Sequence, residues 1–347
     1  MKSQHIFRIF FLSSIIFILF ACKKNEEQVP VTINAESATE VTETSFKISW
    51  SINSSDIKSL SIELSFKDTF EPIERAINVV NTSQTSQVID QMSGATTYYY
   101  RVKASLNDGS TVLSTGKSVT TSYKTESVTI TTSDGINIAG KLKYLESQKN
   151  DKPGIIFMHE LGVWVNNWQS ADLITSLIAQ GYACLIIDFR GHGQSDYYPL
   201  PTDQSQIEEF VNAVTKDLIA SIAFLQSHEI VDGEQLALVG GSLGAIMAIA
   251  GNGYDEVKAT VSLSASQLGI YSVFPGLKIN SAFFIAGELD ANQAVNFAEE
   301  AAALYEIAEE PKKLKILSGN SSHGTDLLIS PGLNQEIIDW INTRFAK

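Results

Sequence analysis

The sequence has only two cysteines, Cys22 and Cys184, among its 347 residues. Cys184 lies in the apolar run ACLII at residues 183–187, which is typical of a buried strand, and a thiol there acts as a small hydrophobic side chain. Cys22 follows a leader-like segment at the start of the chain. These two roles exclude a framework of disulfides.

Positive charge is also in short supply. The chain has 25 lysines and arginines against 39 acidic residues, which gives a formal net charge of −14. Because so acidic a protein repels phosphate backbones, we expect no nucleic-acid partner. Apolar residues make up 44% and charged residues 18%, a globular balance that argues against wholesale disorder, and the length suits two domains.

The N-terminus lacks an apolar run long enough to span a bilayer. Residues 9–20 form an apolar stretch of about 12 residues, whereas a spanning helix needs about 20. The stretch follows Lys2 and Arg8, and its length fits the core of a secretory signal. We therefore predict a signal peptide at residues 1–21.

This signal ends in LFAC at residues 19–22, which resembles the lipobox of bacterial lipoproteins. The resemblance implies that Cys22 carries lipid and that residues 22–28 form a tether. Lipid chains would anchor the protein to the cell envelope without spanning a membrane, and Lys23 after the cysteine favours the outer membrane. The alternative is an ordinary cleaved signal with an incidental cysteine.

Residues 29–122 have the pattern of short antiparallel strands, because apolar and polar residues alternate between clusters of turn residues. A stretch of this kind predicts a β-sandwich. The segment 92–102, MSGATTYYYRV, resembles the fibronectin type III pattern, with Tyr98 at the tyrosine-corner position and Trp50 as the early core tryptophan. The resemblance implies a spacer, or a surface that contacts a protein or a glycan.

The pattern changes in residues 127–347, where a hairpin-like stretch with a turn at 133–135 is followed by apolar runs alternating with helical spacing. The runs lie at 154–158, 183–188, 236–239, 257–263, 282–286 and 314–317. Continuous apolar strands that alternate with helices indicate an α/β fold, a mostly parallel sheet with helices on both faces.

Residues 240–244 read GGSLG, a G-x-S-x-G match between an apolar run and a good helix-forming segment. A nucleophilic serine needs this strand–turn–helix context, because it must stand on a tight turn above the sheet. The pattern alone is common by chance, but this context makes Ser242 the candidate nucleophile.

A nucleophilic serine also needs a base and an acid that orients the base. Asp290 directly follows an apolar run, and His323 lies in a loop after the last one, so both are placed where ligands bind in open α/β sheets. Glu288 is the alternative acid, and Asp290 could instead cap the following helix. His323 could be a surface residue, but it is the histidine best placed to act as the base.

These residues resemble the α/β-hydrolase superfamily, in which nucleophile, acid and histidine follow in this order. The segment 188–195, DFRGHGQS, is very similar to one that shapes a loop beside the superfamily's site. The resemblance covers 127–347 and is closest to dienelactone-hydrolase-like and lysophospholipase-like members. It implies an oxyanion site made by the amides of Leu243 and of Leu161, with Glu160 as the alternative to Leu161.

Two other chemistries are excluded by their motifs. Residues 159–160, HE, begin a zinc-peptidase pattern, but Val163 stands where the second histidine is required. Asp196 stands where a dinucleotide fingerprint needs its last glycine. We therefore expect no metal and no organic cofactor.

We expect a serine esterase acting on a small-molecule or glycan-linked ester. The short segment between the runs ending near 265 and starting near 281 leaves no room for a helical cap. This predicts an open cleft, which suits bulky or polymer-attached esters. The alternatives are a serine peptidase of the same fold, and a non-enzymatic binding protein of the envelope that acts through its β-sandwich.

Overall fold

The computed structural model describes residues 29–148, 151–164, 168, 171–267, 270, 274–292 and 294–345. The predicted signal peptide at 1–21, the predicted lipidation site Cys22 and the tether at 22–28 lie outside these residues. Within the described part of the chain, no helix is both long enough and apolar enough to cross a membrane.

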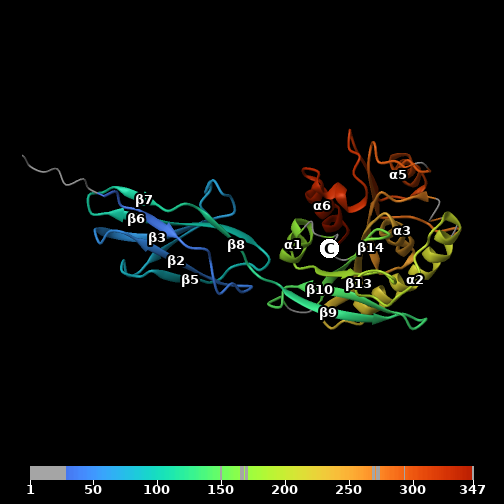
Figure 1. Cartoon of the computed structure of the whole chain (residues 1–347), viewed down its shortest axis with the longest axis horizontal. Coiled ribbons are helices and arrows are strands. Elements are labelled where there is room, and N and C mark those ends of the chain that lie inside the picture. The colour runs from blue at the N-terminus through green and yellow to red at the C-terminus, as the bar shows by residue number, and fades with distance from the viewer. Residues whose placement is uncertain are drawn as a thin grey trace, which may run out of the picture.

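The N-terminal part of the chain forms two antiparallel sheets (Figure 1). One sheet has the order β1-β2-β5, and the other has the order β4-β3-β6-β7 with β8 also paired to β6. The bounds are β1 Ile33–Ala35, β2 Phe46–Ile52, β3 Ile57–Ser65, β4 Arg75–Val79, β5 Ser86–Ile89, β6 Thr97–Leu106, β7 Thr111–Leu113 and β8 Lys117–Thr120.

Alternation along these strands produces one core between the two sheets. Every second residue of β6 is buried, and Phe46 and Ile48 of β2 face the same core from the other sheet. Trp50 lies in this core with 3% of its surface exposed, as its position in the pattern predicted. The predicted antiparallel strands of this region are therefore confirmed.

The rest of the chain is built on an eight-stranded sheet with the order β16-β15-β14-β13-β11-β12-β10-β9. The strands from β11 to β16 run parallel, and β9 and β10 add an antiparallel hairpin at one edge. The bounds are β9 Lys124–Thr131, β10 Asn137–Tyr144, β11 Lys152–Met158, β12 Ala183–Ile187, β13 Val231–Gly241, β14 Val257–Leu263, β15 Ala282–Gly287 and β16 Lys312–Leu317. The predicted mostly parallel sheet is confirmed.

Helices cover both faces of this sheet. Residues of α2, α3 and α5 pack into one hydrophobic core, and residues of α1 and α6 pack into a second core on the opposite face (Figure 1). The bounds are α1 Ala171–Ala179, α2 Gln204–Ser227, α3 Leu243–Ala250, α5 Phe297–Ile307 and α6 Leu333–Phe345, with short 3₁₀ turns at η2 Gly251–Gly253 and η3 Gly324–Ile329. In α2 the buried positions recur three and four residues apart, as its apolar spacing predicted.

The two parts of the chain contact each other through apolar and polar groups: Ala95 belongs to the same hydrophobic cluster as Leu145, and Glu43 makes hydrogen bonds. The Glu43 carboxylate accepts hydrogen bonds from the amides of Glu146 at 2.9 Å and Ser147 at 3.0 Å, and from the Ser147 hydroxyl. Strand β9 begins at Lys124, which pairs with Tyr144 at the end of β10. Residues 121–123 therefore connect the second sheet of the N-terminal part to the hairpin.

Candidate active site

Ser242 stands on the sharp turn between β13 and α3, with φ 51° and ψ −110°. Residues with side chains rarely adopt a positive φ, and such backbone strain persists only where the surrounding packing enforces it. A Cβ on Gly240 would lie 2.0 Å from the Gly244 carbonyl oxygen, and one on Gly244 would lie 2.1 Å from the Met158 carbonyl oxygen. The two glycines therefore allow β13, α3 and β11 to approach closely enough to hold this turn.

His323 and Asp290 are brought together at the carboxyl ends of neighbouring strands. The Nδ1 atom of His323 lies 3.0 Å from both carboxylate oxygens of Asp290, which follows β15 and is 4% exposed. Because a carboxylate only accepts, Nδ1 donates and the Nε2 of a neutral ring is left as the acceptor nitrogen. The ring also packs against Phe297, with 4.4 Å between ring centroids.

The alternative acid, Glu288, is engaged elsewhere. Its carboxylate accepts hydrogen bonds from the Ser318 hydroxyl at 2.8 Å and from the Gly319 amide at 2.6 Å. Both bonds hold the pKa of Glu288 below its ordinary value, and the bond from the Gly319 amide has the larger effect. Glu288 thus ties down the turn after β16, whereas Asp290 is the carboxylate paired with His323.

Ser264, which the sequence patterns did not single out, joins the loops that carry Asp290 and His323. It follows β14, is fully buried and has a φ of 59°. Its hydroxyl donates to Oδ2 of Asp290 at 2.6 Å and accepts from the amide of Gly324 at 3.0 Å. Its place after an apolar strand, like that of Asp290, is the signal that could have marked it.

Glu160 occupies a buried position beside the same loop. It is 7% exposed, and its Oε1 accepts from the amide of Thr325 at 2.5 Å. A Cβ on Gly241 would lie 2.6 Å from this oxygen, and one on Gly324 would lie 2.2 Å from it. The carboxylate therefore packs between the strand that leads to Ser242 and the residues that follow His323.

Two histidines fix the loop after β11. Nδ1 of His159 lies 2.6 Å from the Glu160 carbonyl oxygen, and Nε2 accepts from the Phe189 amide at 3.0 Å. In His192, Nδ1 lies 3.0 Å from the Arg190 carbonyl oxygen and Nε2 accepts from the Gly162 amide at 2.9 Å. Because a backbone amide donates to each Nε2, both rings are neutral, and burial lowers the pKa of His159 to about 4 and lowers that of His192.

The amides of Leu243 and Leu161 come from neighbouring segments. Leu243 is the first residue of α3, where backbone N–H groups have no partner within the helix. The next amide, that of Gly244, donates to the His159 carbonyl oxygen at 3.1 Å, which joins the start of α3 to the loop that contains Leu161. The Gly162 amide is used by His192, so Leu161 or Glu160 would supply the loop's donor to an oxyanion.

The segment 188–195 is held by a buried ion pair. The Arg190 guanidinium and the Asp217 carboxylate are both fully buried and lie 2.8 Å apart, and Arg190 also pairs with Asp134 at 2.9 Å. The segment is therefore held in place by Asp217 of α2 and by Asp134 of the turn between β9 and β10.

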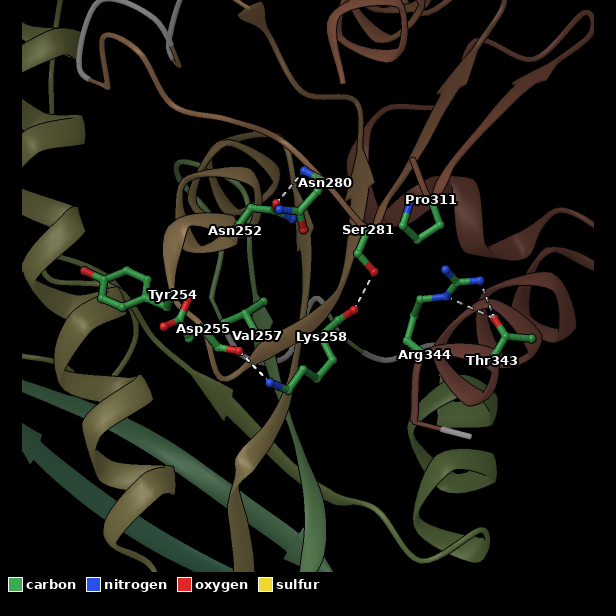
Figure 2. A pocket seen from close by; sticks show the side chains of 10 residues that line it. All are labelled: Asn252, Tyr254, Asp255, Val257, Lys258, Asn280, Ser281, Pro311, Thr343 and Arg344. Carbon is green, nitrogen blue, oxygen red and sulfur yellow. Dashed lines mark hydrogen bonds between the residues drawn. The ribbon is translucent and has the colours of Figure 1, made fainter. Parts of the chain in front are cut away.

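A polar hollow of about 420 Å³ lies at the other end of the sheet (Figure 2). Lys258 near the start of β14 and Ser281 before β15 line it, whereas Ser242 follows the carboxyl end of β13. Figure 2 shows that Lys258 Nζ donates to the Asp255 carbonyl oxygen and that Arg344 bonds to Thr343. This hollow is remote from Ser242, and we assign it no chemistry.

Comparison with known proteins identifies the fold. Residues 155–321 match the family model described as the alpha/beta hydrolase family. An esterase of Pyrococcus furiosus has a similar structure, with 20% sequence identity and a TM-score of 0.50 over 64% of this chain and 93% of that one. The second domain has the α/β-hydrolase fold.

An alpha/beta hydrolase from a Penicillium species is similar to this α/β-hydrolase domain at the same level, with 18% identity and a TM-score of 0.50 over 65% of this chain and 100% of that one. None of the curated proteins compared matches the sequence. At such low identities the structural likeness shows the fold alone. What the α/β-hydrolase domain does has to be argued from its own residues.

Proposed function

We propose that this protein is a serine hydrolase of carboxylic esters in which Ser242 is the nucleophile, His323 the base and Asp290 the orienting acid. The observation that carries the proposal is the pairing of His323 Nδ1 with the buried Asp290 carboxylate, in a sheet that also presents Ser242 on a strained turn. The order of the three residues along the chain agrees with the α/β-hydrolase arrangement.

The proposed reaction is acyl transfer to Ser242 followed by hydrolysis. The Ser242 oxygen attacks the ester carbonyl carbon while Nε2 of His323 takes the hydroxyl proton. The amides of Leu243 and Leu161 stabilise the negative oxygen of the tetrahedral intermediate. Collapse breaks the bond to the alcohol, which leaves with the proton from His323. A water activated by His323 then releases the acid and frees Ser242.

Labelling with a fluorophosphonate probe tests the nucleophile. The wild type should become labelled, and Ser242→Ala should not, because only an activated serine attacks the phosphorus. Ser264→Ala is a useful second variant, since it removes a buried hydroxyl near the same residues but leaves Ser242 in place. Absence of labelling in folded wild-type protein would contradict the proposal. Because serine peptidases react with the same probe, ester and peptide substrates should be compared in parallel.

We further propose that Ser264 is a positioning residue for the base. Ser264→Ala removes one bond to the Asp290 carboxylate and the acceptor of the Gly324 amide, so we expect kcat to fall about tenfold with little change in KM. The matched control is Ser318→Ala, since Ser318 also donates to a carboxylate, that of Glu288. Equal kcat values for Ser264→Ala and the wild type, with only the unfolding midpoint lowered, would show a purely structural role.

The N-terminal domain is proposed to be a fibronectin type III-like sandwich that acts as a spacer. Its support is the division of strands between the two sheets and the Tyr98 hydroxyl, which accepts from the Ser93 amide at 2.9 Å as in a tyrosine corner. The chain enters the domain at Ile33, which pairs with Ile52 at the end of β2, near the Leu106 end of β6. It leaves for β9 after Thr120, which pairs with Thr97 at the other end of β6. The domain would thus separate the hydrolase from whatever holds the N-terminus.

A lipid on Cys22 would anchor the N-terminus in a membrane of the cell envelope, and the outer membrane is the proposed location. The expected observation is that a palmitate analogue labels the wild type but not Cys22→Ala, and that the variant leaves the membrane fraction.

The cap-less cleft also stays a prediction, because residues 268–269 and 271–273 of the connection between β14 and β15 lie outside the described residues.

A further inference from the structure

A groove of about 810 Å³ lies over the antiparallel hairpin formed by β9 and β10. Its floor is the face of β9 and β10 that carries Ser127, Thr129 and Lys141. Its sides are Trp164, from the loop after β11, and Gln194, from the loop after β12. These two loops follow the carboxyl ends of β11 and β12, the end of the sheet at which β13 leads into Ser242.

The groove is open because this face of the hairpin is not part of either core. Ile130, Ile138 and Leu142 point to the opposite face and are buried there, whereas Ser127, Thr129 and Lys141 are exposed.

The lining combines one aromatic ring with hydrogen-bonding groups of both kinds. Trp164 is 50% exposed, a large exposure for an aromatic side chain. Hydroxyls of Ser127 and Thr129 and the amide of Gln194 donate and accept, and Lys141 donates. A sugar has an apolar C–H face that packs on an aromatic ring and a rim of hydroxyls, so it matches this lining. A fatty acyl chain would need a continuous apolar wall.

Charge argues in the same direction. Lys141 is the only basic residue among the described residues that line the groove, Asp188 lines it as well, and the chain as a whole has a net charge of −14. An anionic polymer would be repelled by this background. The favoured occupant is therefore a neutral sugar chain.

The groove and the proposed site of acyl transfer share one loop. Leu161 and Trp164 belong to one loop, and His192, which fixes that loop through the Gly162 amide, directly precedes Gly193 of the groove. From β13 to β10 there are three strand spacings, about 14 Å at about 4.8 Å per spacing. An ester group at Ser242 could thus belong to a chain whose neighbouring sugars lie over Trp164.

We propose that this groove is a glycan subsite, so that the enzyme removes acyl groups from a neutral oligosaccharide or polysaccharide with Trp164 as the stacking residue. The proposal rests on the proposed ester hydrolase and adds its substrate class.

The kinetic test uses the full-length chain with 4-nitrophenyl acetate and with O-acetylated cello-oligosaccharides of increasing length. In the wild type, kcat/KM should rise with sugar chain length. Trp164→Ala should raise KM for the long esters about tenfold and leave the aryl acetate unchanged, and Trp164→Phe should restore much of the loss. Tyr197→Ala is the matched control, since Tyr197 is an exposed aromatic residue of the neighbouring loop.

Failure of this proposal can be told apart from failure of the esterase. If the aryl acetate is hydrolysed but chain length has no effect, or Trp164→Ala matches the wild type on long esters, the subsite is overturned and the esterase stands. If no ester is hydrolysed, affinity electrophoresis in gels with a panel of neutral polysaccharides decides. Retardation that is lost in Trp164→Ala upholds the subsite, and no retardation by any polysaccharide overturns it.

Discussion

Ser242→Ala is expected to lower kcat for an aryl acetate by a factor of about 10⁴ or more, since the variant loses covalent catalysis altogether. KM should change little, because the side chain removed is small and the oxyanion amides remain. Initial rates under single-turnover conditions, with protein purified free of host esterases, measure the effect. The near-ultraviolet circular dichroism of the variant should match that of the wild type.

The same experiment becomes sharper when Ser242 and His323 are replaced together. Residues that act as one catalytic unit are strongly non-additive, so the double variant Ser242→Ala, His323→Ala should be no slower than the single variants. Multiplicative losses would mean that the two side chains contribute independently, and the proposed relay between them would then be wrong. The variants are expected to keep a residual rate above that of the uncatalysed hydrolysis in buffer, because the oxyanion amides remain.

The sequence predicted much of the α/β domain, because its strands are continuous apolar runs and its turns contain glycine. The run at 257–263 coincides with β14, and the motif at 240–244 stands on the strand–turn–helix that it requires. These features are local, so the order of residues along the chain is enough to indicate them. The antiparallel hairpin at the sheet edge follows in the same way from alternation and a turn at 133–135.

Contacts between distant segments could not be predicted in this way. Ser264 bonds to Asp290 across two neighbouring strands, and Glu160 bonds to Thr325 from the far end of the chain. Neither pair leaves a periodic pattern in the sequence. Only the structure relates Glu160 to Gly241 and Gly324, whose lack of side chains makes room for its carboxylate.

Asp290→Asn is expected to have the second largest effect, a loss of about 10⁴ in kcat. The amide can offer an N–H to Nδ1 of His323, which favours the wrong tautomer, and it cannot stabilise the imidazolium that forms when Ser242 is deprotonated. Glu288→Gln is the matched control, because it makes the same chemical change in the acid two residues earlier, whose partners are Ser318 and Gly319.

Rates for both variants with the same aryl acetate decide between the two acids. A large loss in Asp290→Asn with near wild-type activity in Glu288→Gln is the expected result, since only Asp290 lies within hydrogen-bonding distance of His323. The reverse pattern would move the orienting role to Glu288 and require the loop after β15 to rearrange. Because the Asp290 carboxylate also accepts from Ser264, part of the loss in Asp290→Asn should already be present in Ser264→Ala, and the double variant should lose less than the product of the two.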